Sequence, residues 1–279
     1  MDGLFDEDSP AGPVRIHDGK DSVTVAVSAL AASLGVRVLR AGGSVFVRHG
    51  LISPRVSPFT TFLVDPDRIS ELAVALEADG WQPISTTLVG QLLPPAIRSY
   101  QLDRFDSTLN LHGVIPGFFA DPADVFELIW EHREVVHLRG VPIHIVDKPT
   151  TVLLAAHNRL GGQHAARQNG AHFDYFLAQF RGVLDASDRD ALLARAHAVG
   201  GECEVRPLLV ELDLEPHSPI EPSSGYIRRR LAVRKPAAGD IWLINGLERA
   251  GGRKTKFPGV LAATRSMVRL LGARRRAAR

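Results

Sequence analysis

The sequence is poor in cysteine, methionine and aromatic residues, with 1 Cys, 2 Met and 6% aromatic residues among 279. The single cysteine, Cys203, excludes an internal disulfide and is typical of a protein from a reducing compartment. Cys203 has no Cys or His partner at a standard metal-ligand spacing. We therefore expect a buried or half-buried thiol at this position rather than a nucleophile.

Long apolar runs are also missing. The longest include residues 25–34 and 151–156, well short of the roughly 18 apolar residues that a membrane-spanning helix needs. The acidic start MDGLFDEDSP lacks the basic region of a signal peptide. We expect a cytoplasmic protein with no membrane partner.

Acidic residues are absent from residues 249–279, which carry ten Lys or Arg. The rest of the chain has 23 basic and 31 acidic residues, a net charge of −8. The chain is thus an acidic body with a basic C-terminal tail, and such a tail can contact RNA or an acidic protein. The alternative is a solvated, frayed terminus.

What the sequence does contain is ordinary for a globular protein: 45% hydrophobic and 23% charged residues, and a length that allows one large or two ordinary domains. Apolar periodicity and turn residues predict a sequence of helices and strands. We expect helices at 21–35, 65–80, 122–133, 151–157, 173–184, 188–199, 205–214 and 260–271, and strands at 36–39, 59–64, 98–105, 108–114, 136–138 and 142–146.

Individual residues place several of these boundaries. Asp21 or Ser22 is expected to cap the first helix, and Asp65 the second. The strand at 59–64 should lie beside the strand at 36–39. Residues 215–236 are either a long loop or an interrupted helix.

The composition changes near Asp147, after which almost every segment has a helical period. We therefore expect a loose N-terminal arm at 1–20, an α/β domain at 21–147, a helical domain at 148–272 and a basic tail at 273–279. The fold class is α+β, with a mixed sheet in the first domain.

A set of short motifs occurs in a characteristic order within residues 36–159. They are a glycine turn after a strand (Gly42, Gly43, Ser44), an Arg before the next strand (Arg55), a strand end (Val64-Asp65-Pro66-Asp67), a helix end (Gly80-Trp81), a strand triplet (Asn110-Leu111-His112) and an apolar helix ending in His157. In this order they resemble the bacterial nucleotidyltransferase family of the polymerase-β-like superfamily.

This resemblance implies a small nucleotidyltransferase-like α/β head followed by a helical body. It also implies that Gly42, Gly43 and Ser44 hold the phosphates of a nucleotide, and that Arg55 and His112 assist in binding the ligand. The family's three metal-binding Asp positions correspond to Phe59, Thr61 and Asn110.

None of these three residues carries a carboxylate. Nucleotidyl transfer in this superfamily needs carboxylates to hold divalent ions at the triphosphate, and Mg²⁺ prefers Asp oxygens as ligands. Phe59 has no ligand atom, whereas Thr61 and Asn110 offer only neutral oxygens. We therefore expect no metal and no cofactor, unless an Mg²⁺ site is rebuilt from other carboxylates.

The other candidates for such a site are weaker. Asp65 and Asp67 form an Asp-x-Asp at a helix start, where capping explains them, and Asp103 and Asp106 suit a surface turn. Single histidines more often pack in a core than bind a ligand, which applies to His49, His112 and His157. The set His157, His164 and His172 matches no standard zinc spacing.

Three functions remain open from the sequence. The first is a degenerate nucleotidyltransferase-like protein that binds a nucleotide or another anionic small molecule. The second is an active nucleotidyltransferase that moves a nucleotidyl group from a nucleoside triphosphate to a hydroxyl acceptor. The third is a nucleic-acid or protein interaction module that uses the basic runs at 228–230 and 274–276; these runs lack interleaved aromatic residues for base stacking.

Overall fold

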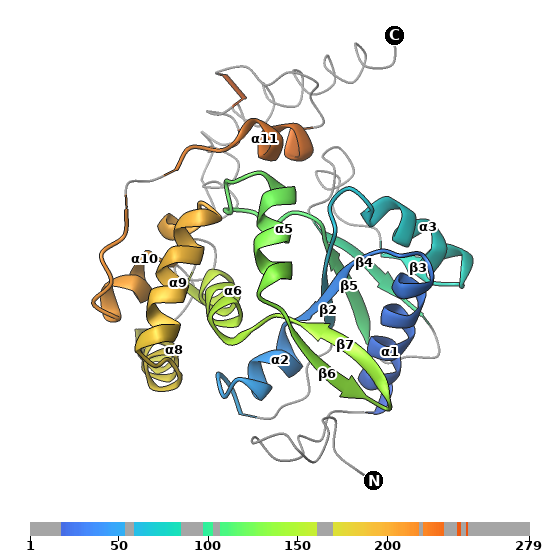
Figure 1. Ribbon diagram of the computed structural model, residues 1–279, viewed down its shortest axis with the longest axis horizontal. Helices are drawn as coiled ribbons and strands as arrows, with labels where there is room; N and C mark the ends of the chain where they lie inside the picture. Colours follow the sequence, from blue (N-terminus) through green and yellow to red (C-terminus); the bar gives the residue numbers. More distant parts are fainter. Residues whose placement is uncertain are drawn as a thin grey trace.

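The computed structural model describes residues 18–53, 59–84, 97–102, 107–160, 170–217, 220–231, 239, 240 and 244. These residues form a mixed sheet followed by a group of C-terminal helices, which confirms the expected α+β class (Figure 1). The sheet has seven strands in the order β3-β4-β5-β2-β1-β7-β6.

Strands precede most of the helices along the chain. The strands are β1 (Val38–Ala41), β2 (Phe59–Val64), β3 (Gln82–Pro83), β4 (Ile97–Gln101), β5 (Thr108–His112), β6 (Glu134–Leu138) and β7 (Val141–Ile145). The helices in the described part of the chain include α1 (Asp18–Ser33), α2 (Gly43–Arg48), α3 (Ile69–Ala78), α5 (Pro122–Glu131), α6 (Lys148–Leu160), α8 (Gly170–Val183), α9 (Ala186–Ala198), α10 (Glu202–Glu211) and α11 (Ser224–Leu231).

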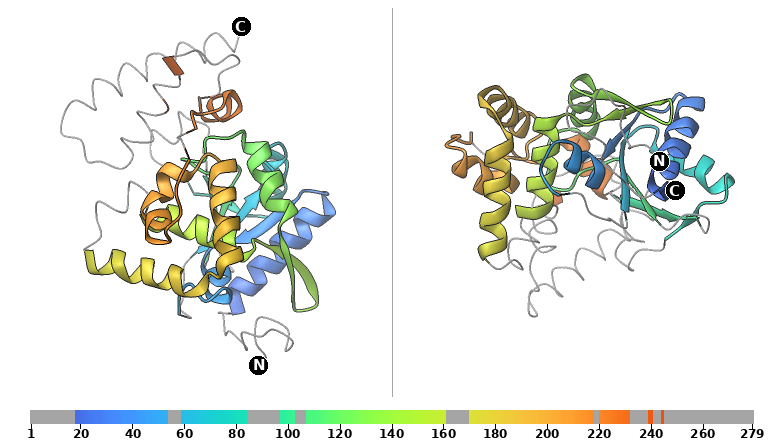
Figure 2. Two further views of the ribbon diagram at one scale, coloured as in Figure 1. Left: turned by 60° about the vertical axis from the view of Figure 1, so that its left-hand side comes forward. Right: turned by 90° about the horizontal axis from the view of Figure 1, so that it is seen from below.

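Strand β2 lies in the middle of the sheet, antiparallel to β1 and parallel to β5. Its side chains alternate between the two faces, as in any strand. Phe62 and Val64 enter a core with α1 and α3, whereas Leu63 enters a second core with α5 and α6. The sheet therefore separates two apolar cores, with α1 and α3 on one side and the helical group on the other (Figure 2).

Helix α6 connects the sheet to the helical group. It packs against α2, α8, α9 and α10, and its residues 152–156 are buried. The Arg195 guanidinium of α9 donates to Asp147, just before α6, at 2.6 Å, and to the Thr150 hydroxyl at 2.9 Å. Arg195 is 8% exposed, so this buried ion pair links α9 to the start of α6, and loss of either partner would leave an uncompensated buried charge.

Helix α11 returns to the α/β head. The Tyr226 hydroxyl accepts the Gly117 N–H at 3.1 Å, and Arg229 donates to the Pro66 carbonyl at 3.0 Å and to the Asp67 carboxylate. Residues 215–236 thus contain a helix, which agrees with the interrupted-helix alternative.

Most strands occur where the sequence predicts them. Strand β2 has the expected bounds and lies beside β1, and the β4–β5 and β6–β7 pairs are antiparallel. Strand β1 starts two residues later than expected, because its pairing with β2 runs from Val38 opposite Val64 to Ala41 opposite Thr61. The helix predicted at 260–271 and the basic tail lie outside the described residues.

Two predicted caps are wrong. Helix α1 begins at Asp18, so Asp21 and Ser22 lie inside it. Asp65 does not cap α3, whose N-cap is Arg68. Asp65 instead accepts the Asp67 N–H at 3.1 Å and pairs with Arg37 at 2.7 Å.

The prediction of a buried or half-buried Cys203 is also wrong, because the thiol is exposed. Val205, Leu208 and Leu209 form the buried face of α10, and position 203 falls on the opposite side of the helix. The domain boundary near Asp147 stays a prediction. Among the described helices, none is long and apolar enough to cross a membrane.

Gly225 provides a test of how α11 packs against the start of α5. A Cβ at this position would lie 1.5 Å from Asp121 Oδ2, and Asp121 caps α5 through the Ala123 N–H. We expect Gly225→Ala to lower the free energy of unfolding by about 1–3 kcal/mol through overpacking, measured by urea denaturation.

Gly182→Ala is the matched control, because Gly182 is also helical and its Cβ would meet no atom within 4 Å. Alanine is the better helix former by up to about 1 kcal/mol, so this variant should be as stable as the wild type or more stable. Equal stability of the two variants would contradict the close packing of Gly225 in α11 against Asp121.

Candidate functional site

The ends of β1, β2 and β5 bring together three positions of the sequence motifs, Gly42, Thr61 and Asn110, and the sheet face at these positions is called the crevice below. Thr61 on β2 pairs with Ala41 on β1 and with Asn110 on β5. Gly42 follows β1 directly, and a Cβ on it would lie 3.4 Å from the Thr61 side chain. The glycine turn, Thr61 and Asn110 are therefore neighbours, as the sequence motifs predict.

Phe59, Thr61 and Asn110 share one face of the sheet, because Phe59 precedes Thr61 by two residues and Asn110 is in register with Thr61. Phe59 is 48% exposed. The Asn110 carbonyl oxygen accepts the Ser99 hydroxyl at 2.8 Å. The only oxygen with which the Asn110 side chain can ligate a cation is thus already hydrogen-bonded to β4.

The carboxylates of the β2–α3 turn do not substitute for the missing ones. Asp65 lies four residues beyond Thr61, roughly 13 Å along the strand, and is paired with Arg37 at 2.7 Å. Asp67 is paired with Arg229. Asp103 and Asp106 lie outside the described residues. Within the described ranges, the group of three or more potential metal ligands belongs to α9, α10 and the segment after α10, not to these strands.

A buried cation lies behind the crevice, on the face of the sheet that packs against α1 and α3. Arg40 on β1 is 3% exposed, and its guanidinium donates to the Thr61 carbonyl at 2.9 Å and to the Ala41 carbonyl. Burial lowers the pKa of Arg40 to about 10, and Asp21 on α1 partly opposes this shift. The side chain remains cationic at pH 7, so a positive charge lies directly behind the residue at the second acidic position.

The expected phosphate-binding turn has the backbone geometry that requires glycine. Gly42 has φ 80° and ψ −153° and is the N-cap of α2, a conformation that residues with a Cβ rarely adopt. Gly42, Gly43 and Ser44 are half-buried. Arg55, the other expected phosphate ligand, lies outside the described residues.

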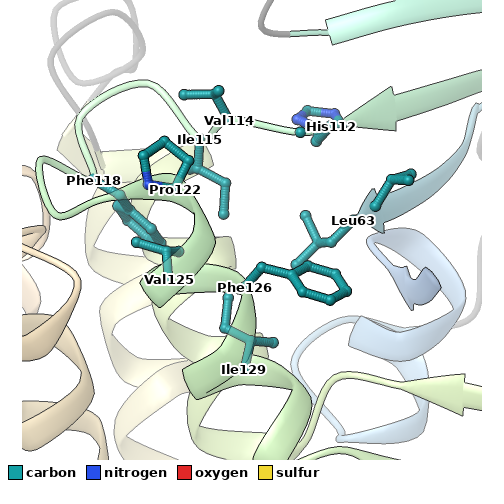
Figure 3. A pocket seen from close by; sticks show the side chains of 11 residues that line it. Leu63, His112, Val114, Ile115, Phe118, Pro122, Val125, Phe126 and Ile129 are labelled. Carbon is teal, nitrogen blue, oxygen red and sulfur yellow. The ribbon is translucent and has the colours of Figure 1, made fainter. Parts of the chain in front are cut away.

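His112 lies at the end of β5, in register with Leu63, and contributes to a mostly apolar cleft (Figure 3). The cleft has a cavity volume of about 20 Å³, roughly the room for one water molecule, between the ends of β2 and β5 and helix α5. Its lining also includes Val114, Ile115, Phe118, Pro122, Val125 and Phe126.

Burial and the nearby charge of His157 lower the pKa of His112 to about 4. His112 is therefore neutral at pH 7, and it can donate or accept one hydrogen bond but cannot neutralise a phosphate. His112 does not lie beside the glycine turn. It lies two residues beyond Asn110 on the same face of the sheet, where the lining is apolar.

The other two candidate histidines have structural contacts. His157 Nε2–H donates to the Pro116 carbonyl at 2.5 Å, and its ring lies edge-on to Phe118 at 5.2 Å. His49 Nε2 is 3.1 Å from the Val146 carbonyl, under α2, and burial lowers its pKa. Both rings thus hold loops or strand ends in place.

Two contributors to the site were not predicted from the sequence. An Arg at position 40, next to the glycine turn in an otherwise apolar strand, is a signal that could have been noticed. Ser99 could not have been found, because its contact with Asn110 depends on the register between β4 and β5.

No protein-family model matches this chain, and no curated protein matches it. Solved structures do match, each at 12% identity. The lincomycin-bound lincosamide antibiotic adenylyltransferase LnuA matches over 61% of this chain and 99% of its own, with a TM-score of 0.38.

Two further structures give similar values. An antigenic nucleotidyltransferase-like protein from Paracoccidioides brasiliensis matches over 71% of this chain and 94% of its own, with a TM-score of 0.44. The antibiotic-resistance factor ANT(2'')-Ia matches over 69% and 91%, with a TM-score of 0.34. At these identities the likeness concerns the fold alone.

The lowered pKa of His112 predicts a pH-dependent stability. The folded pKa of about 4 lies below the usual value of about 6.5, so below pH 6.5 the unfolded chain binds the proton first and the free energy of unfolding falls. Between pH 6.5 and pH 5 we expect the free energy of unfolding of the wild type to fall by up to about 2 kcal/mol through His112. The His112→Gln variant should lack this contribution.

The measurement is urea denaturation of both proteins across this pH range. His49 and His144, whose pKa values are also lowered by burial, remain in the variant, so the difference between the two proteins isolates His112. His132→Gln, at an exposed histidine, is the control, and its free energy of unfolding should depend on pH as in the wild type. The interpretation of His112 fails if the His112→Gln variant shows the same pH dependence as the wild type.

Proposed function

We propose that this chain is a nucleotidyltransferase-like protein that has lost metal-dependent transfer and binds a nucleotide or another anionic small molecule. The observation that carries the proposal is the convergence of Gly42, Thr61 and Asn110 at one end of the sheet, with no carboxylate at the three positions where the resemblance implies one. Such a crevice keeps its shape but lacks the charges that hold Mg²⁺.

The electrostatics of the crevice disfavour a divalent cation. In an active site of this type the carboxylates offset the metal charge, and the metal offsets the triphosphate. Here the residues at the three positions are neutral, and the buried guanidinium of Arg40 lies behind Thr61, on the opposite face of the sheet against Phe62, with its charge partly offset by Asp21. Mg²⁺ therefore meets no compensating negative charge at these positions.

The apolar cleft lies next to the crevice. It begins two residues beyond Asn110 on the same sheet face and includes neutral His112 as its polar group. Ligand sites commonly combine an apolar lining with a few polar groups that fix orientation. At about 20 Å³ the cavity is too small for a base, so the cleft must widen before the base of a nucleotide can enter it.

The described part of the basic region supports a nucleic-acid surface less well. Arg229, in the middle of the run at 228–230, is paired with Asp67 and bonded to the Pro66 carbonyl. That cation holds α11 against the head and is not available to a phosphate backbone. The tail at 273–279 lies outside the described residues.

The first test is calorimetry with ATP and with pyrophosphate, in Mg²⁺ and in EDTA. We expect binding in both buffers, with dissociation constants that differ by less than about tenfold, or 1.4 kcal/mol. Gly42→Ala, which adds a Cβ at a positive φ beside Thr61, should weaken binding.

Gly140→Ala is the matched control, since Gly140 also has a positive φ but lies in the β6–β7 turn with no atom within 4 Å of an added Cβ. Binding that requires Mg²⁺, or transfer of an α-labelled nucleotide to an acceptor, would instead support the active nucleotidyltransferase. Equal affinities of the two glycine variants would argue against the crevice as the binding site.

A second test restores two of the missing acids. In Thr61→Asp with Asn110→Asp, carboxylates occupy directly paired positions of adjacent strands, and their repulsion is expected to cost about 1 kcal/mol. Thr61→Asn, which adds no charge, serves as the control. In EDTA the double variant should melt below the wild type, and excess Mg²⁺ or Mn²⁺ should restore part of the difference.

The measurement is the melting temperature of the three proteins in EDTA and in each metal. A response to metal in the double variant alone supports the assignment of positions 61 and 110 to the ancestral metal site. If metal leaves the double variant unchanged, these positions do not converge on a single ion.

A further inference from the structure

Two histidines and a glutamate meet on the helical group, far from the crevice in the sequence. His197 is in the last turn of α9, Glu202 is the first residue of α10, and His217 follows α10. The three potential ligand atoms lie within 4.8 Å of one another. Helices α9 and α10 pack side by side (Figure 1).

Each carboxylate oxygen of Glu202 is directed at one imidazole. Oε1 is 2.8 Å from His217 Nδ1, and Oε2 is 3.4 Å from His197 Nδ1. The two rings face each other, with centroids 4.3 Å apart and planes inclined at 45°. The Nδ1 atoms thus converge on the same carboxylate from two sides.

These distances suit a zinc ion after small adjustments. Zn²⁺ binds histidine nitrogens and carboxylate oxygens at about 2.1 Å, which places two ligand atoms of a tetrahedral site roughly 3.4 Å apart. Two imidazoles and a carboxylate also form a ligand set that suits Zn²⁺ rather than Mg²⁺ or Ca²⁺, which prefer oxygen ligands alone.

We propose that His197, Glu202 and His217 bind a Zn²⁺ ion, through Nδ1 of each histidine and the carboxylate of the glutamate. Water completes the coordination, because the side chains of His197 and His217 are 44% and 53% exposed. To bind the ion, each Nδ1 must carry no hydrogen, so the proton of the neutral ring is then on Nε2.

The turn between α9 and α10 holds two of the ligands in a fixed relation. Gly200 has φ 67°, and a Cβ on it would lie 3.2 Å from the backbone nitrogens of Phe119 and Ala120. The Ala120 N–H donates to the Val199 carbonyl at 3.1 Å. The turn is therefore pressed against the 118–120 loop, so His197 and Glu202 need little reorganisation to bind a metal.

The third ligand is fixed by its backbone. The His217 N–H donates to Glu202 Oε1 at 3.1 Å, in addition to the contact of its ring. Glu202 is 4% exposed and has no cationic Lys or Arg partner among its contacts in the described residues. A bound cation would compensate its buried charge more fully than two imidazoles do.

The site has a structural consequence. His217 ends the described segment that follows α10 and precedes α11, and α11 packs over the loop beside the apolar cleft through Tyr226. A zinc ion would attach this connection to the helical group. Zinc binding at this cluster is independent of which ligand occupies the crevice.

The test uses the full chain, freed of metal with a chelator and titrated with ZnCl₂ by calorimetry and with CoCl₂ by visible absorption. We expect a zinc-binding event in the wild type that raises the melting temperature, and Co²⁺ absorption bands typical of a low-coordinate site. His197→Ala, His217→Ala and Glu202→Gln should each weaken this event by at least about 100-fold, since even outer contacts of metal ligands change affinity 10–100-fold.

His137→Ala, at an exposed histidine of β6, is the matched control and should bind zinc like the wild type. Because the two histidines of the site are about half exposed, their variants should fold, and Glu202→Gln keeps the oxygen that accepts the His217 N–H. Equal zinc affinity and equal Co²⁺ spectra in the wild type, His197→Ala and His217→Ala would overturn the proposal and leave the cluster as hydrogen bonds alone.

Discussion

The register of β2 between β1 and β5 is the constraint on which the rest of this molecule depends. Pairing Thr61 with both Ala41 and Asn110 sends Phe62 and Val64 into one core and Leu63 into the other. A shift of one residue would exchange these faces and bury Thr61 in place of Phe62. The same register that separates the cores thus also sets the composition of the crevice.

The acidic residues near the head are used in ion pairs that hold elements together. Asp65 and Glu127 share Arg37, whose pKa is raised chiefly by the Glu127 hydrogen bond and then by Asp65. Asp147, just before α6, pairs with Arg195 of α9. These carboxylates are used in ion pairs away from Thr61 and Asn110, and the cation of Arg40 lies on the opposite face of the sheet.

The sequence predicts the central strands well because their signals are local. Alternating apolar residues, a glycine turn and β-branched residues identify β2 and the hairpin of β6 and β7 without any tertiary information. The prediction of Asp65 as a helix cap is wrong because α3 begins at Ile69, four residues later, after a turn in which Asp65 accepts the Asp67 N–H. The other oxygen of Asp65 pairs with Arg37, 28 residues away, a contact that local capping rules cannot include.

The candidate site was predictable only in part. The order of the short motifs correctly places Gly42, Thr61 and Asn110 together, since each motif belongs to a strand of the same sheet. The apolar cleft, the Ser99 contact and the His197, Glu202 and His217 cluster come from packing between segments that are distant in the sequence. No periodicity encodes such contacts, which depend on how α5, α9 and α10 are placed.

The hydrogen bond from Ser99 to Asn110 has a consequence for how this lineage can change. A neutral amide that accepts a hydrogen bond from a neighbouring strand satisfies this position without any ion. Introducing metal chemistry here would need acids at several positions together, because a single new carboxylate adds a desolvation cost before any ion offsets it. The neutral crevice is therefore hard to convert into a metal site one mutation at a time.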